Sequence, residues 1–221
     1  STVKIEFEKI TNIPALYKEL APEWYDMIKE HLPKNTTTYF DFIADTSHSV
    51  YKPGRESRSD FKGVWQLLSG KNNIYTDFKT NTSISQKPVF EETFLVTDTL
   101  QKIKWKITAD TRTIAGFDCR KAVGILDDSI AVFAFYTDEI MISGGPESIH
   151  GLPGMILGVG VPRLHTTWFA TKVEINNVNL NAILPEKKGK KSDRATMMKQ
   201  LDKVLHEWGT YGSKMLVNFA I

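Results

Sequence analysis

Cysteine is nearly absent from this sequence, since Cys119 is the only one among 221 residues. One thiol cannot form an intramolecular disulfide, and no CxxC pair for metal or redox chemistry exists. The chain also contains no run of about 18 uncharged apolar residues, so we predict no transmembrane segment. No GxSxG, HExxH, GxGxxG or P-loop motif is present, and no catalytic residue or cofactor is indicated.

The overall charge of the chain is small. A formal net charge of +2 does not indicate nucleic acid as the main partner. Hydrophobic residues make up 41% and charged residues 24%, as in ordinary globular proteins, and we expect one domain over residues 1–221. The chain begins with Ser1 instead of Met, which fits a processed or trimmed chain and a periplasmic or secreted protein whose signal peptide is missing.

Strand patterns dominate the sequence. In the first segment Val3, Ile5 and Phe7 alternate with charged residues, which predicts a half-buried strand. Similar signals predict further strands at 36–44, 61–68, 73–78, 89–96, 103–108, 118–125, 129–136, 155–161 and 166–175. Asp127 and Asp128 mark a tight turn between two of them. A solvated loop is the simplest interpretation of the lysine-rich stretch 187–191.

Two helical segments flank these strands. One begins near Pro14 and is kinked or broken at Pro22, with its apolar stripe at Leu16, Leu20, Trp24, Met27 and Ile28. The other begins after Ser192 as cap and ends at Gly209, with its stripe at Met197, Leu201, Val204, Leu205 and Trp208. Because the helices lie outside the run of strands, the predicted fold is mainly β (α+β). We expect a curved antiparallel sheet or half-open barrel with N-terminal and C-terminal helices on one face or edge.

Two glycine–proline corners stand close together in the sequence. Their residues are Gly145, Pro146, Gly151, Leu152, Pro153 and Gly154. Proline presets φ and glycine supplies positive φ, so each corner is a turn. The short segment 147–150 between them is fixed at both ends. This arrangement suits a binding site and equally a purely structural corner.

The second of these corners also carries a family resemblance. Residues 151–156 read GLPGMI, one conservative change from a GLPGLI signature, and IKWKI at 103–107, IAGFDCRKA at 114–122 and FYTDEI at 135–140 follow the same order. The chain therefore resembles the GLPGLI family of Bacteroidota. That resemblance implies a secreted or periplasmic cell-envelope protein without an accepted activity, often found near outer-membrane transport machinery.

Two functions are weighed on these grounds. The first is a non-enzymatic envelope protein whose concave sheet face binds a hydrophobic or peptide-like ligand, or an outer-membrane transport partner. Its candidate ligand-binding residues are Trp105, Tyr136, His150 and Met155. The alternative is a copper- or zinc-binding protein or metal-dependent enzyme that uses His150, His165 and Cys119. Cationic neighbours would make Cys119 reactive, whereas a buried structural thiol is the other interpretation.

Overall fold

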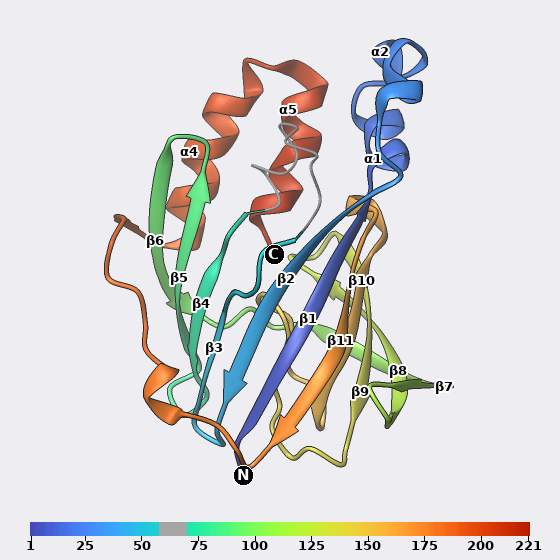
Figure 1. Ribbon diagram of the computed structural model, residues 1–221. Coiled ribbons are helices and arrows are strands. Elements are labelled where there is room, and N and C mark those ends of the chain that lie inside the picture. Colours follow the sequence, from blue (N-terminus) through green and yellow to red (C-terminus); the bar gives the residue numbers. More distant parts are fainter. Residues whose placement is uncertain (58–69) are drawn as a thin grey trace.

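The protein folds around one large sheet. The computed structural model describes residues 1–57 and 70–221, and the predicted strand at 61–68 lies outside them. Twelve strands form the sheet in the order β12-β6-β5-β4-β3-β2-β1-β11-β10-β9-β8-β7 (Figure 1). Four α-helices accompany it within the described ranges. The predicted mainly β class is therefore confirmed.

The strands are β1 (Val3–Asn12), β2 (Asn35–Ala44), β3 (His48–Pro53), β4 (Asn73–Asp77), β5 (Thr82–Val89), β6 (Glu92–Thr99), β7 (Lys104–Ile114), β8 (Phe117–Leu126), β9 (Ile130–Thr137), β10 (Met155–Val161), β11 (Thr166–Ile175) and β12 (Lys190–Ser192). The α-helices are α1 (Ile13–Leu20), α2 (Pro22–Ile28), α4 (Arg194–His206) and α5 (Gly209–Met215). Short 3-10 helices are η1 (Lys29–His31), η2 (Pro162–Leu164), η3 (Leu180–Ala182) and η4 (Leu216–Phe219).

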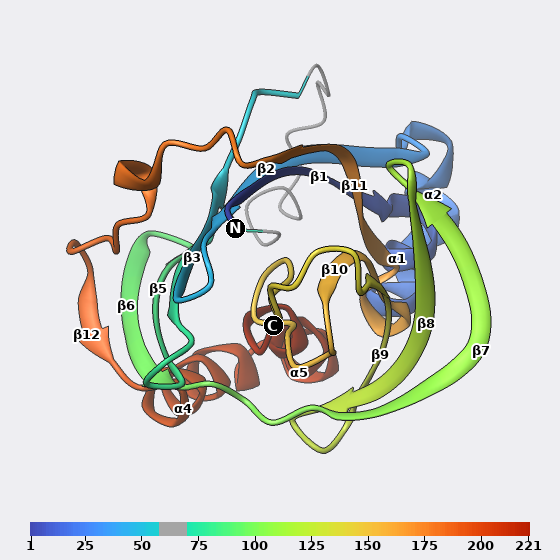
Figure 2. The same ribbon diagram turned by 90° about the horizontal axis from the view of Figure 1, so that it is seen from below.

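Neighbouring strands are antiparallel, apart from the edge strand β12, which runs parallel to β6. Seen along its axis, the sheet curls into an incomplete ring, and the segment from β6 to β7 crosses the open side (Figure 2). This arrangement matches the expected curved, half-open barrel. No helix in the described part of the chain is long and apolar enough to cross a membrane.

The first helical segment is broken, as its proline predicts. Asn12 caps α1 by accepting a hydrogen bond from the Ala15 N–H at 3.1 Å. Ala21 then leaves the helical region, and Pro22 begins α2. The expected apolar stripe is buried only before the break. Leu16 and Leu20 are buried, whereas Trp24 and Met27 are exposed to solvent.

Three other local expectations need correction. The predicted strand at 89–96 is not continuous, because β5 ends at Val89 and β6 begins at Glu92. Between them, Phe90 adopts a positive φ of 56° and the chain reverses direction. The lysine-rich stretch is not all loop, since Lys190 and Lys191 pair with β6. The cap of α4 is Asp193, one residue later than expected, and accepts from the Thr196 N–H at 2.7 Å.

Two apolar clusters hold the sheet in shape. The segment 138–154 folds into the concave side of the ring (Figure 2), where Ile140, Ile142, Ile149 and Leu152 are at most 5% exposed. A second cluster lies where α1, α4 and α5 pack against β5 and β6. The concave face is thus filled by the protein's own chain.

Gly154 fixes the end of this inner segment. Its φ is +151°, and a Cβ placed there would lie 2.1 Å from the Thr137 carbonyl oxygen. Because that oxygen belongs to the backbone of β9, the clash cannot be relieved by a side-chain rotation. The predicted glycine–proline turn is therefore also a close approach of two backbones.

We expect Gly154→Ala to lower the free energy of unfolding by about 3 kcal/mol, because strain at positive φ and overpacking add. Gly116→Ala is the matched control, since Gly116 has φ +84° and a Cβ there meets nothing within 4 Å. This control should cost about 1 kcal/mol. Urea unfolding of both variants measures the difference, and equal losses would contradict the close-approach argument.

Candidate functional site

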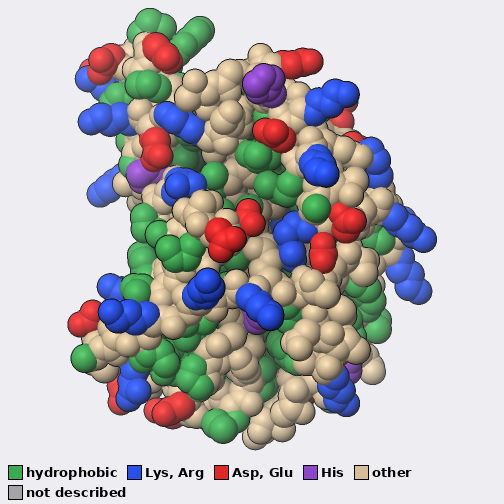
Figure 3. All heavy atoms as spheres, turned by 180° about the vertical axis from the view of Figure 1, so that it is seen from behind, with side chains coloured by type: hydrophobic (Ala, Val, Ile, Leu, Met, Phe, Trp, Pro, Cys, Tyr) green, Lys and Arg blue, Asp and Glu red, His purple; other side chains and the backbone are tan. Residues whose placement is uncertain are grey.

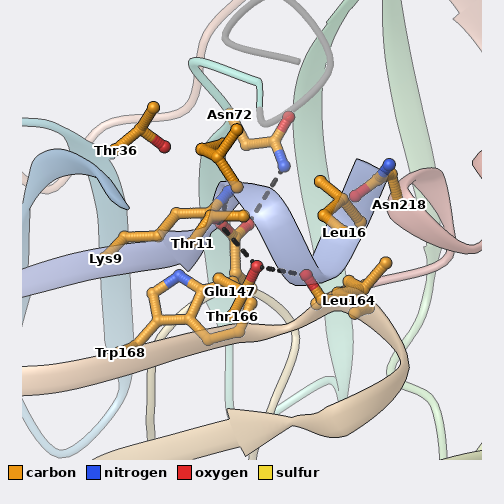
Figure 4. A pocket seen from close by; sticks show the side chains of 12 residues that line it. Lys9, Thr11, Leu16, Thr36, Asn72, Glu147, Leu164, Thr166, Trp168 and Asn218 are labelled. Carbon is orange, nitrogen blue, oxygen red and sulfur yellow. Dashed lines mark hydrogen bonds and ion pairs between the residues drawn. The ribbon is translucent and has the colours of Figure 1, made fainter. Parts of the chain in front are cut away.

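A cluster of charged and polar side chains lies inside the barrel. Glu147, on the inner segment, accepts hydrogen bonds from the Tyr51 hydroxyl and the Asn72 amide, each at 3.0 Å. The Lys9 ammonium lies 4.0 Å from the same carboxylate, and both side chains are at least nine-tenths buried. Figure 4 shows Lys9, Asn72 and Trp168 gathered around Glu147.

The backbone brings these groups together at some cost. Glu147 has a positive φ of 53°, a conformation that is uncommon for residues other than glycine and costs roughly 1 kcal/mol or more. Lys9 occupies an inward position of β1, continuing the row of Val3, Ile5 and Phe7. Burial lowers the pKa of Lys9, and the nearby Glu147 carboxylate opposes that shift. The pair therefore links the inner segment to β1 at a strained backbone position.

A second buried lysine faces the same interior from β5. Lys87 donates to the main-chain oxygens of Phe219 and Ile221 at 3.1 and 2.9 Å. Burial lowers its pKa to about 8, with Glu147 opposing and Arg194 reinforcing the shift. Lys9, Lys87 and Glu147 are the buried charged residues in the described ranges. Positive charge thus exceeds negative charge among these three when both lysines are protonated.

Room beside the cluster is scarce. Glu147 lines two cavities of about 20 Å³ each. That is roughly the space of one water molecule, far below the ~300 Å³ at which ligand pockets begin. This interior suits a structural role better than the binding of an organic ligand.

A much larger hollow opens between the helices. This aromatic groove has a volume of about 730 Å³. It is lined by Tyr17, Leu20, Ala21, Pro22, Glu23, Trp24, Ile28, Trp208, Thr210, Tyr211 and Lys214. Helices α1 and α2 form one wall, and α5 with the residue before it forms the other. In Figure 3 the protrusion at upper left carries hydrophobic side chains beside charged ones.

Solvent reaches the tryptophans of this groove. Trp24 is 61% exposed and Trp208 is 44% exposed. Trp208 is held in place by an edge contact with Phe90, with ring centroids 5.4 Å apart. Helix α2 has no buried residue, although it carries Trp24 and Met27. Clusters of large apolar side chains that are exposed to solvent are characteristic of interaction sites.

The four predicted ligand-binding residues do not line this groove. The Trp105 indole donates to the His150 carbonyl oxygen at 2.9 Å, so these two residues meet. Tyr136 and Met155 are buried in the main core on neighbouring strands. Of the four, His150 lines one of the two small interior cavities. Burial lowers the pKa of the His150 imidazole, which bonds the Gln101 carbonyl oxygen at 2.8 Å.

The three predicted metal ligands occupy different surroundings. His165 pairs with Glu19 near the end of α1, whereas His150 bonds Gln101. Cys119 is buried, and burial raises its pKa to about 11, so its thiol is protonated at neutral pH. Across the described ranges, no three His, Cys, Asp or Glu side chains come together as a metal site would require.

Sequence reasoning missed the residues that define both sites. A signal for Lys9 was present, because the alternation of β1 places it on the apolar face. Glu147 lies inside the pinned segment but carries no distinguishing pattern. Trp24 and Trp208 follow helical spacing that indicates burial, and only the break at Pro22 hints that Trp24 is exposed.

The Lys9–Glu147 pair can be tested by a double-mutant cycle. Glu147→Gln removes the carboxylate that lies 4.0 Å from the buried Lys9 ammonium, and we expect a loss of about 3–5 kcal/mol in the free energy of unfolding. Adding Lys9→Met should restore a large part of that loss. Urea unfolding of the four proteins gives the coupling, and purely additive losses would contradict the pairing.

Lys87 should make stability depend on pH. Its pKa of about 8 lies below the ordinary value of 10.5, so above pH 8 the unfolded chain holds more protons than the folded one. Stability then rises with pH, by up to about 1 kcal/mol per unit between pH 8 and 9.5. Lys87→Met is the control protein. The raised pKa of the buried Cys119 thiol lowers stability as the pH rises above 9, but it does so equally in both proteins and cancels in the comparison. Parallel stability curves for the two proteins would refute the assignment.

Comparison with known proteins gives one family and one fold. The family described as "N-glycanase peptide, N-terminal domain" matches residues 71–199, more than half of the chain. Two solved structures of PNGF-II, in C2 and P21 space groups, superpose with TM-scores of 0.57 and 0.56 at 17% and 16% identity. Each comparison covers 90% of this chain and 32% of the PNGF-II chain. No curated protein matches.

These findings correct the sequence-based assignment. Membership of the GLPGLI family is wrong, because the matching family is a different one and its match includes the GLPGMI segment. Glycine and proline are the residues that tight turns favour, so such a motif identifies a turn more reliably than a family. Two predicted functions are therefore also wrong. They are the envelope protein that binds a hydrophobic or peptide-like ligand or a transport partner, and the metal-binding alternative. The chain belongs to the family of N-glycanase peptide N-terminal domains.

Proposed function

We propose that this domain binds the carbohydrate part of glycoproteins in the aromatic groove between α1–α2 and α5. The observation that carries the proposal is the pair of exposed tryptophans, Trp24 and Trp208, on the lining of a 730 Å³ groove. Family membership supplies the connection to glycoproteins, since the family description refers to an N-glycanase.

The chemistry of the groove suits a sugar. A pyranose ring has apolar C–H faces and a polar rim of hydroxyl groups. Indole and phenol rings offer flat apolar surfaces with a polar edge, and they contact such a ligand without losing much conformational freedom. Glu23, Thr210 and Lys214 add hydrogen-bonding groups beside the rings. The volume also falls within the roughly 300–1,000 Å³ of small-ligand sites.

The scope of the proposal is binding. This chain spans about a third of the PNGF-II chains that it resembles, with 32% of their length covered. Cleavage by a larger protein that contains such a domain is a separate proposal, and no residue here is assigned to it. The periplasmic or secreted location expected from the sequence stays a proposal of the same kind, consistent with a glycoprotein ligand.

We expect Trp24→Ala and Trp208→Ala each to weaken binding of a neutral N-glycan by about 5- to 30-fold. A stacked aromatic contact contributes roughly 1–2 kcal/mol once its buried area is included. Isothermal titration calorimetry with the free glycan and with a glycopeptide carrying it measures the effect. Because Trp24 is 61% exposed, Trp24→Ala should unfold at nearly the same urea concentration as the parent protein, whereas Trp208→Ala also loses the ring contact with Phe90 and should be somewhat less stable.

Met141→Ala is the matched control, since Met141 is 79% exposed and lies outside the groove lining. It should bind the glycan as the parent does. Absence of binding at millimolar glycan, or binding that neither tryptophan substitution changes, would sink the proposed function.

A further inference from the structure

We infer that the aromatic groove continues into a subsite for a sugar carboxylate, so that the domain prefers acidic glycans over neutral ones. This inference rests on the proposed function. Its basis is a second pocket of about 310 Å³, here called the basic pocket. The basic pocket and the aromatic groove share Leu20, Thr210 and Lys214 in their linings.

Arg163 is the principal group of the basic pocket. It lies on η2, the turn between β10 and β11, and its residue is exposed. That turn is closed by the His165 N–H donating to the Pro162 carbonyl oxygen at 3.0 Å. The His165 carbonyl oxygen in turn accepts from Asn12 at 2.9 Å, which ties the turn to the start of α1. The guanidinium is therefore attached to a rigid base at the rim of the barrel.

The charges of the basic pocket favour an anion. Its charged lining residues are Arg163, Lys214 and Glu19. The Glu19 carboxylate already pairs with His165 outside the lining, and the Lys214 ammonium donates to the Glu19 main-chain oxygen at 2.7 Å. That bond uses one of the three ammonium hydrogens and leaves the charge in place. Two cations against one engaged carboxylate make the pocket basic.

A carboxylate is the anion that this chemistry recognises best. The planar guanidinium of arginine offers paired N–H groups that match the two oxygens of a carboxylate. Ser213, Thr210 and Asn218 supply neutral hydrogen-bonding groups to the same pocket, as the hydroxyls of a sugar ring require. A two-residue segment of glycan would then place one ring on the tryptophans and the acidic ring beside Arg163.

The test uses three forms of one biantennary N-glycan: with terminal sialic acid, with the sialic acid carboxylate converted to its methyl ester, and without sialic acid. We expect the acid to bind about 5- to 10-fold more tightly than the other two forms at low salt. The preference should shrink at 0.5 M NaCl, because salt screens a partly exposed pair. Arg163→Ala should remove the preference and leave binding of the neutral form within about twofold.

Arg120→Ala is the control for loss of one exposed positive charge, since Arg120 lies on β8 outside both linings. It should keep the preference, and Arg163→Lys should keep part of it. Equal binding of the three glycans would overturn the carboxylate subsite and leave the proposed function standing. A preference that survives Arg163→Ala would also overturn it. Failure of all three glycans to bind would instead refute the proposed function, and this inference with it.

Discussion

The buried Glu147 carboxylate determines how the interior of this barrel is filled. An open, curled sheet of twelve strands has a concave face that must be covered. Here the segment 138–154 covers it, and Glu147 connects that segment to β1 through Lys9 and to β3 through Tyr51. Burial and the adjacent carboxylate both raise the pKa of Tyr51, so its hydroxyl stays a hydrogen-bond donor. Without the carboxylate, Lys9 would be a buried charge lacking this counter-ion.

Filling the interior moves the available binding surface to the rim. The cavities around Glu147 hold about 20 Å³ each, whereas the helical groove holds about 730 Å³. The helices at the rim are short and joined by sharp breaks, so their apolar side chains are not all drawn into the core. Helix α2 buries none of its residues. A rigid barrel that presents exposed aromatic rings on one end is a suitable frame for recognising a flat, partly apolar ligand.

Local patterns predicted many of the strands, but they did not single out the residues of the two sites described above, for identifiable reasons. Period-two alternation depends on neighbouring residues alone, so β1 and the β8–β9 hairpin followed from the sequence. Strand β5 did not, because Ser83, Ser85 and Lys87 face inward where apolar residues are expected. The exposure of Trp24 depends on how Ala21 redirects the chain, and that backbone geometry is not encoded in helical spacing. The four predicted ligand-binding residues lie in or beside the core and the inner segment, and their role in binding stays a prediction.

The glycine–proline motif has a structural role that does not depend on the family. The signature residues 151–154 serve the inner segment: Gly154 approaches the backbone of Thr137, and Gly151 lies beside the Trp105 indole. Any barrel that folds a loop back onto its own sheet needs such corners, whatever its ligand. The proposed binding function depends on Trp24, Trp208 and Arg163, which lie at the rim outside the main apolar core.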